Sequence, residues 1–386
     1  MSMLTEKQIE LRNEIRAFVD SEISPHTEEL DRSKEYPREI VNKVGALGYG
    51  GLPFSKELGG SGYGIVEGVI FLEELSRGMG SLGFILCASL FQCCYALRDS
   101  VSEEQKEQWL MPAIACDKVL TLALSEEIGG SDALGLDTVA TRCSDGWILN
   151  GSKCCITNAG VADGYIVGAK TNLNSRSRNV SLFYVDASAE GVDDDGRFDM
   201  IGLNNSPTGT IKFTNCHLPA DALIGVENEG YNPLKSALNC GRLALAAVSI
   251  GMAQSALEKS VDFSRACSNF DRSISSYQGV TFPIAEMYMN IGVARNMLYH
   301  VAEMTEAGVR CTMETASLKL FSTEMCQKVC RDAALIHGGR GFGSHCDVER
   351  LLRDSQLLMV AEGTSQICKV IISDGIYNTP FGKPIQ

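Results

Sequence analysis

The sequence predicts an α+β protein made of three consecutive parts: an N-terminal helical domain, a middle β-barrel-like domain and a C-terminal four-helix bundle. Apolar residues recur at helical spacing up to about Val119, and short β-rich runs broken by Gly, Asn and Asp follow. Long helical segments return from about Asn232. A chain of 386 residues is long for one core. We therefore expect domains at 1–119, 120–231 and 232–386.

The first part contains three expected helices. One covers 4–23 with Thr5 as its N-cap, a second covers 67–79, and a third covers 102–115 after a Ser-x-x-Gln capping pattern. The run 78–97 is uncharged and reaches the length of a membrane span. Because Gly, Ser, Cys and Gln fill nearly half of it, we expect a buried helix and no membrane segment.

The middle and last parts differ in their texture. Strands are expected within 121–126, 140–159, 164–171, 179–187 and 208–218, and the acidic run 190–199 is expected to be a solvated loop. Long helices are expected at 236–266, 281–308 and 313–339. Some of these have apolar faces on both sides, which is typical of a bundle that packs on itself and on a partner.

Composition excludes several classes of function. The net charge of −14 argues against a nucleic-acid partner, because phosphate backbones require a basic surface. Residues from Tyr231 onward are nearly neutral, so an anionic ligand would be repelled least there. The 15 cysteines include adjacent pairs, and no apolar signal segment precedes them. We expect reduced cytosolic thiols in the core rather than disulfides.

One motif opens the β part: ALSEEIGGSDALG, which contains Leu124, Ser125, Gly130 and Ser131. It is predicted to be a strand that runs into a glycine turn with hydroxyl groups on both sides. Such a turn lets backbone N–H groups approach a ring or a phosphate closely. The same pattern is equally compatible with a hairpin that has a type I′ turn.

A second motif is LLMVAEGTSQI, in which Glu362 stands between an apolar run and a small turn. A carboxylate there either faces solvent at a helix end or is held for chemistry. The apolar neighbours Met359, Val360 and Ala361 are expected to raise its pKa towards neutrality by desolvation. The histidines His337 and His345, with Cys346, form no convincing ligand set, and no metal is expected.

These motifs occur together with LGGSGYG (58–64), SEEQKEQWL and LNGSKCCITNAG, in the order and spacing of the acyl-CoA dehydrogenase family. The chain resembles that family over nearly its whole length. The resemblance implies FAD-dependent α,β-dehydrogenation of an acyl thioester. It also implies a cytoplasmic homodimer or homotetramer, with FAD held between the β domain and the bundle and a neighbouring subunit completing the site.

The resemblance also assigns roles to residues. Glu362 matches the base that removes the α-proton while hydride passes to flavin N5, and Arg242 matches an arginine near the substrate entrance. Some branches place the base beside that arginine, but the residue here is Gly241. The residues that match cofactor contacts are Leu124, Ser125, Gly130, Ser131, Cys155, Thr157, Phe270, Gln278, Gly338, Gly339, Thr364 and Gln366.

Four positions depart from the family pattern. Cys155 replaces a tryptophan beside the flavin, Cys267 an arginine that reaches the pyrophosphate, Leu335 a glutamine, and Ala361 an aromatic residue before the base. A lost arginine–phosphate contact costs about 1.5–3 kcal/mol, so we expect weaker FAD binding unless Arg265 or Arg340 compensates.

The four departures do not decide which acyl group or which carrier the substrate has. A roomier or more polar pocket favours a small acyl, hydroxyacyl or aminoacyl group, carried either by CoA or by the phosphopantetheine arm of an acyl carrier protein. Electrons would leave to a flavoprotein or to oxygen. Two other interpretations remain: a flavin-dependent oxidase or hydroxylase on the same scaffold, and a non-catalytic scaffold that has lost FAD.

Overall fold

The chain folds in the predicted order of helices, sheet and helices. The computed structural model describes residues 4–175 and 179–378. The helices of the first part are α1 (Glu6–Glu22), α2 (Thr27–Ser33), α3 (Arg38–Ala46), α4 (Ile65–Gly78), α5 (Gly80–Leu86), α6 (Cys94–Arg98), α7 (Glu103–Gln105) and α8 (Met111–Ile114). Two π-helical segments, η4 (Cys87–Cys93) and η5 (Lys106–Leu110), interrupt them.

Both predicted N-terminal caps are present. The Thr5 hydroxyl accepts a hydrogen bond from the Gln8 N–H at 3.3 Å, and the Gln8 side chain accepts one from the Thr5 N–H at 2.9 Å. Ser102 and Gln105 form the same reciprocal pair. Each cap satisfies N–H groups that a first helical turn leaves without partners, which fixes where these helices begin.

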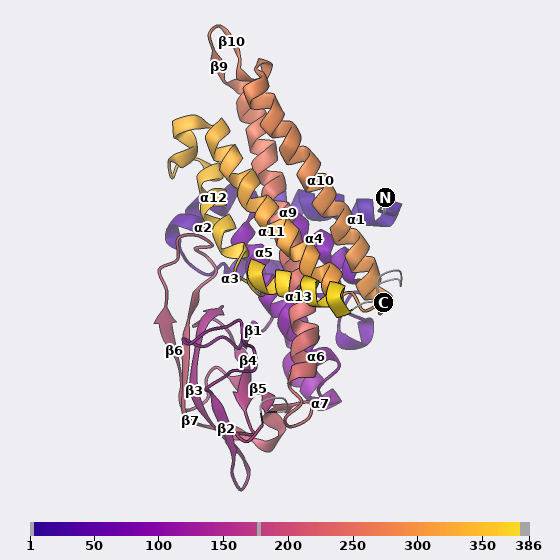
Figure 1. The fold of residues 1–386 in the computed structure, drawn as a ribbon, viewed down its shortest axis with the longest axis vertical. Coiled ribbons are helices and arrows are strands. Elements are labelled where there is room, and N and C mark those ends of the chain that lie inside the picture. The colour runs from indigo at the N-terminus through magenta and orange to yellow at the C-terminus, as the bar shows by residue number, and fades with distance from the viewer. Residues whose placement is uncertain (1–3, 176–178, 379–386) are drawn as a thin grey trace.

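Among the residues that the structure describes, the middle part forms an eight-stranded mixed sheet in the order β6-β7-β3-β2-β4-β5-β8, with β1 also paired to β4. The strands are β1 (Leu120–Ala123), β2 (Val139–Arg142), β3 (Gly146–Thr157), β4 (Gly164–Lys170), β5 (Val180–Asp186), β6 (Val192–Arg197), β7 (Thr208–Pro219) and β8 (Leu223–Ile224). Figure 1 places this sheet at one end of the molecule. A separate buried cluster that includes Trp147, Tyr165 and Phe183 forms its core.

The prediction of a solvated loop at 190–199 was wrong. Residues Val192–Arg197 form the edge strand β6, which pairs antiparallel with β7. An edge strand tolerates charge because one side faces solvent. In addition, the Tyr165 hydroxyl donates to Asp194, so one of the acidic side chains has a specific partner.

The C-terminal part contains α9 (Tyr231–Ala266), α10 (Gln278–Glu306), α11 (Thr312–Ile336), α12 (Asp347–Leu358) and α13 (Ser365–Asn378). A small hairpin, β9 (Ser268–Asn269) and β10 (Arg272–Ser273), joins α9 to α10. It projects from the end of the molecule opposite the sheet (Figure 1).

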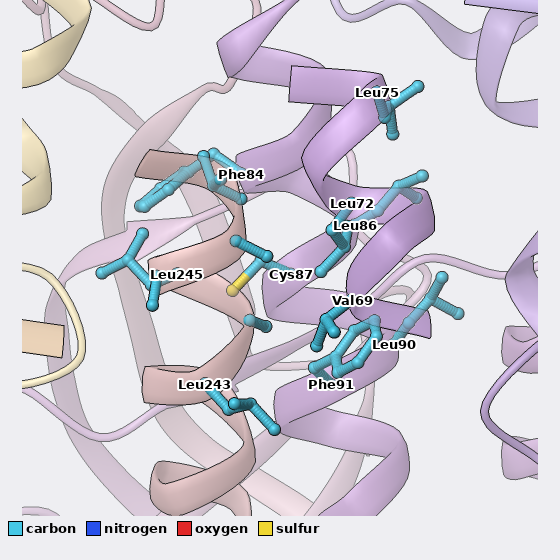
Figure 2. Close-up of a cluster of buried hydrophobic side chains, with 14 of the residues drawn as sticks. Val69, Leu72, Leu75, Phe84, Leu86, Cys87, Leu90, Phe91, Leu243 and Leu245 are labelled. Atoms are coloured by element: carbon cyan, nitrogen blue, oxygen red, sulfur yellow. The ribbon is translucent and has the colours of Figure 1, made fainter. Parts of the chain in front are cut away.

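Helix α9 and the stretch from α5 to α6 are long and apolar enough to cross a membrane by length and composition. Both are core helices here, with 83% and 100% of the tested window buried. Figure 2 shows Cys87, Leu90 and Phe91 of η4 in one apolar cluster with Leu243 and Leu245 of α9. All 15 cysteines are free and most are buried, which confirms the expectation of core thiols.

Candidate active site

Glu362 lies in the tight turn between α12 and α13. Its φ of 55° is in the left-handed region, where a residue other than glycine is uncommon and is held by its surroundings. The Thr364 hydroxyl accepts a hydrogen bond from the Ile367 N–H at 3.2 Å and so caps α13. The turn therefore has a defined conformation from which one carboxylate projects.

Two buried cations bind the main chain of this turn. The ammonium group of Lys319, on α11, donates to the carbonyl oxygens of Met359 at 3.1 Å and Gly363 at 2.7 Å. The Arg242 guanidinium, on α9, donates to the Glu362 carbonyl oxygen at 3.1 Å. Burial lowers the pKa of Lys319 to about 8. Because both cations hold backbone oxygens, they fix the turn without covering the carboxylate.

The carboxylate itself lies between η4 and α9. The Gln92 amide nitrogen donates to Oε1 at 2.8 Å and to Oε2 at 3.0 Å. On the other side is Gly241, where a Cβ atom would overlap with Oε2. The position that carries the base in some family branches is thus adjacent to Glu362, and the absence of a side chain there makes the space that Glu362 occupies.

Burial raises the pKa of Glu362 to about 7, against the opposing effects of Arg242, Lys319 and the Gln92 hydrogen bond. The predicted direction is confirmed, but one predicted cause is wrong. Val360 is 54% exposed, so it does not cover the carboxylate. The apolar surroundings come from η4 and α9, which are distant in sequence.

The strand β1 and the turn after it form a second part of the site. The Lys153 ammonium, fully buried on β3, donates to the Leu124 carbonyl at 3.1 Å and to Glu126 at 2.7 Å. The Cys154 N–H donates to the Ser125 carbonyl at 2.8 Å. These bonds lock Leu124 and Ser125 against β3, on which Cys155 and Thr157 also lie.

This turn is closed like a hairpin, one of the two alternatives that the sequence left open, but it is not of type I′. Glu126 and Gly129 exchange two backbone hydrogen bonds, at 2.9 and 3.2 Å, around Glu127 and Ile128. Neither central residue has the positive φ that a type I′ turn requires. Gly130 follows, and a Cβ atom there would lie 2.5 Å from the Ser125 hydroxyl oxygen, so the turn closes tightly on Ser125.

Segment η4 joins the two parts. Its Ser89 hydroxyl accepts the Leu120 N–H of β1 at 3.2 Å, and its Cys87 thiol lies 3.6 Å from the Gly241 carbonyl oxygen. Its Gln92 contacts Glu362. One short segment therefore holds the β1 end of the sheet, α9 and the Glu362 turn together.

The residues present fit a dinucleotide cofactor. A Cβ atom at Gly129 would meet nothing within 4 Å, so the backbone of the turn after β1 is open to a ligand. The same holds at Gly338 and Gly339, which follow His337 near the hairpin end of α9. Cys155 is exposed and has a φ of 58°, which presents an uncovered surface on β3. Hydroxyl groups of the kind that bind phosphate are available at Ser131 and Thr364.

A single chain does not bring all the predicted cofactor residues together. Phe270 is 91% exposed at the tip of the β9–β10 hairpin, and Gln278 is exposed where α10 begins. Both belong to the hairpin end of the molecule, opposite the sheet that carries Leu124 and Thr157 (Figure 1). Gln366 is also exposed, on α13.

Three functional candidates in the structure were not predicted from the sequence. Gln92 was visible as the one amide side chain in the uncharged run 78–97. Lys153 and Lys319 were visible as the single charges in the runs 146–162 and 315–323. That type of signal marks a buried polar group with a partner, but it does not name the partner.

The histidines do not change this site. His337 is buried, stacks on Phe263 with ring centroids 4.2 Å apart and lies 2.8 Å from the Ala333 carbonyl oxygen through Nδ1, so it has a packing role. His217 lies beside Cys143 and Asp145 at the surface. Two of the three residues are exposed and Cys143 is half-buried, and we assign the group no ligand.

A cavity of about 690 Å³ lies where the start of α9 meets α6 and the loop between α10 and α11. Arg98, Lys235 and Arg310 are among its lining residues. It also reaches Asn239, whose side-chain oxygen accepts a hydrogen bond from Arg242 at 3.2 Å. Arg242 itself is buried, so it connects this cavity to the Glu362 turn.

Comparison with known proteins places the chain. Three family profiles match it: acyl-CoA dehydrogenase N-terminal domain (residues 5–117), middle domain (121–216) and C-terminal domain (228–377). A probable acyl-CoA dehydrogenase of Bacillus subtilis, YngJ, is 35% identical over 96% of this chain and 98% of its own length.

Two solved structures are similar. The butyryl-CoA dehydrogenase of Megasphaera elsdenii has a TM-score of 0.95 and 28% identity, covering 98% of this chain and 100% of its own. The prolyl acyl carrier protein oxidase AnaB has a TM-score of 0.94 and 26% identity, covering 97% and 100%. With all three domain profiles and a relative that aligns along nearly its full length, the chain belongs to the acyl-CoA dehydrogenase family.

Proposed function

We propose that the protein dehydrogenates the α,β-bond of a small acyl thioester and that Glu362 is its catalytic base. The observation that carries this proposal is a carboxylate on a fixed turn whose pKa is raised to about 7. A base whose pKa lies near the working pH is ionised often enough to accept a proton and basic enough to remove one. The raised pKa of Glu362 meets both needs.

FAD is the cofactor of this class of oxidoreductase, and the residues that would hold it here are Leu124, Ser125, Ser131, Thr157 and Thr364. When bound, FAD supplies the two-electron acceptor for the hydride that leaves the β-carbon. Gly338 and Gly339 would admit the dinucleotide close to the main chain. Gly130, Cys155, Phe270, Gln278 and Gln366 complete the proposed set of cofactor contacts.

The chain's own residues prepare the proton transfer. Glu362 accepts the α-proton on a carboxylate oxygen and becomes neutral, which its desolvated position favours. Lys319 and Arg242 hold the main chain on both sides of it, so its approach to the α-carbon is set before substrate binds. Segment η4 and α9 exclude water from one side of the carboxylate.

We infer that the phosphate-bearing arm of the substrate lies in the cavity at the start of α9. Lys235 and Arg310 would attract an anion there, and both belong to the part of the chain that is nearly neutral overall. Arg98 also lines the cavity but is paired with Asp99, and Glu306 is an acidic residue in the lining. CoA and the phosphopantetheine arm of a carrier protein share this chemistry. Of the two similar structures, one is named for a CoA thioester and the other for an acyl carrier protein. We favour the acyl carrier protein as the substrate's carrier.

We also propose how the protein assembles and which acceptor takes its electrons. The protein acts in the cytoplasm as a homodimer or homotetramer, in which the exposed hairpin of one copy completes the cofactor site of another. Electrons leave to an electron-transferring flavoprotein. Oxygen is the second candidate acceptor, because one of the similar structures is named as an oxidase.

The decisive experiment starts with the visible spectrum of the purified protein. Anaerobic addition of matched acyl groups on CoA, on a carrier protein and on pantetheine without phosphate should bleach the flavin bands with one phosphate-bearing class. The Glu362→Gln variant should remain yellow and bleach at least about 10³-fold more slowly. Oxygen uptake without another acceptor would identify an oxidase. A colourless protein that cannot be reconstituted with FAD would leave the scaffold interpretation.

A further inference from the structure

Among the described residues, Gln92 is the only side chain with a hydrogen bond to the carboxylate of Glu362. Its amide nitrogen lies 2.8 Å from Oε1 and 3.0 Å from Oε2, so one NH₂ group spans both oxygens. The residues are 270 positions apart in sequence. Only the folded structure can bring residues so distant in sequence together, and η4 is the segment that places Gln92 beside Glu362.

Segment η4 holds Gln92 on a rigid support. Its neighbours Phe91 and Cys93 are fully buried, and Leu90 and Phe91 pack in the cluster drawn in Figure 2. A π-helical turn inserts an extra residue into a helix and re-aims the side chains beside it, often at a functional site. Here it turns one amide out of an apolar cluster and towards the carboxylate.

We propose that Gln92 is a positioning residue that fixes the Glu362 carboxylate between η4 and α9 and keeps it in its charged form. The inference rests on the proposed role of Glu362 as the base. An N–H donor favours the carboxylate over the acid, so Gln92 opposes the effect of burial. Without it, burial would hold more of the base in its protonated, inactive form at neutral pH.

The amide also suits a base that changes its protonation state. A glutamine side chain offers two N–H donors at one end and an acceptor oxygen at the other. The donor end matches the carboxylate seen here. After proton transfer, rotation of the amide group presents the oxygen to the new O–H of Glu362, so the neutral acid also has a partner.

Other ionisable groups lie near Glu362 on α9, α11, η4 and α13. Arg242 on α9 and Lys319 on α11 lower the pKa of Glu362 through their charge. The thiols of Cys87 and Cys93 on η4 and of Cys368 on α13 have pKa values raised by burial, so they are neutral in the working range. Gln92 is therefore the neutral group whose removal changes the titration of Glu362 without changing the local charge.

The test compares Gln92→Leu, Gln92→Glu and a control, Leu90→Met, which is a volume-conserving change on the same segment. Isotope-edited infrared spectroscopy follows the ionisation of Glu362 in the protein without substrate, with Glu362→Gln assigning the band. We expect the midpoint to rise by about one pH unit in Gln92→Leu, since hydrogen bonds to charged groups are of that size. It should rise further in Gln92→Glu and stay unchanged in Leu90→Met.

A second measurement is the pH profile of anaerobic flavin reduction. In Gln92→Leu the rate should fall most below pH 7 and recover as the pH rises. An unchanged midpoint together with a rate loss that is uniform across pH would overturn the proposal. If the midpoint shifts but no thioester reduces the flavin, the role of Gln92 in holding Glu362 stands, and the proposed function fails.

Discussion

At the scale of single residues, the site depends as much on a missing side chain as on those present. Gly241 lies in the interior of α9, where glycine destabilises a helix by roughly 0.5–1 kcal/mol relative to alanine. The Glu362 carboxylate fills the space that a Cβ atom would need. The sequence revealed that no carboxylate stands at 241, but it did not reveal that the two positions compete for one space.

The Gly241→Ala variant should separate stability from activity. Alanine favours the helix, and its Cβ atom overlaps with only one side chain. The unfolding temperature should therefore fall little. The displaced carboxylate should slow anaerobic flavin reduction by about 10- to 100-fold. The control is Glu10→Ala, at an exposed position of α1, and it should keep the full rate. An unimpaired Gly241→Ala enzyme would contradict this geometry.

At the scale of elements, the sequence predicted those whose signal is local. The caps at Thr5 and Ser102 and the long C-terminal helices were predictable because periodicity and capping act within a few residues. The strand β6 was not, because its acidic residues form a strand only through pairing with β7. The Glu362–Gln92 contact was equally beyond reach, since it joins segments from opposite ends of the chain.

The ion pair between Lys153 and Glu126 joins β3 to the loop between β1 and β2. Glu126 also accepts the N–H groups of Asp137 at 2.5 Å and Thr138 at 3.0 Å, so it fixes both ends of the loop between β1 and β2. Lys153→Met leaves a buried carboxylate without its cation, which should cost about 3–5 kcal/mol in urea unfolding. Lys212→Met, at an exposed position of β7, should cost less than about 0.5 kcal/mol. Equal stability of the two variants would show that the pair is dispensable.

At the scale of the whole molecule, exposed apolar side chains predict how copies assemble. Phe282, Met289 and Val293 are 59%, 57% and 53% exposed and recur at helical spacing on one face of α10. Phe270, at the hairpin beside the start of α10, is 91% exposed. Exposed apolar residues that recur on one helix face in this way favour an interaction surface. A second copy of the chain is the occupant that would also complete the divided cofactor site.

The double variant Met289→Glu/Val293→Glu should therefore lose assembly and cofactor together. Sedimentation should show the wild type at no less than twice the chain mass of 41.7 kDa, and the variant at that mass. The variant should also be colourless if, as we propose, each cofactor site takes its hairpin residues from the neighbouring copy. Leu173→Glu is the control, since Leu173 is 70% exposed on the loop after β4, away from this stripe. A yellow monomer would show that one chain suffices to hold the cofactor, and the exposed hairpin would then need another role.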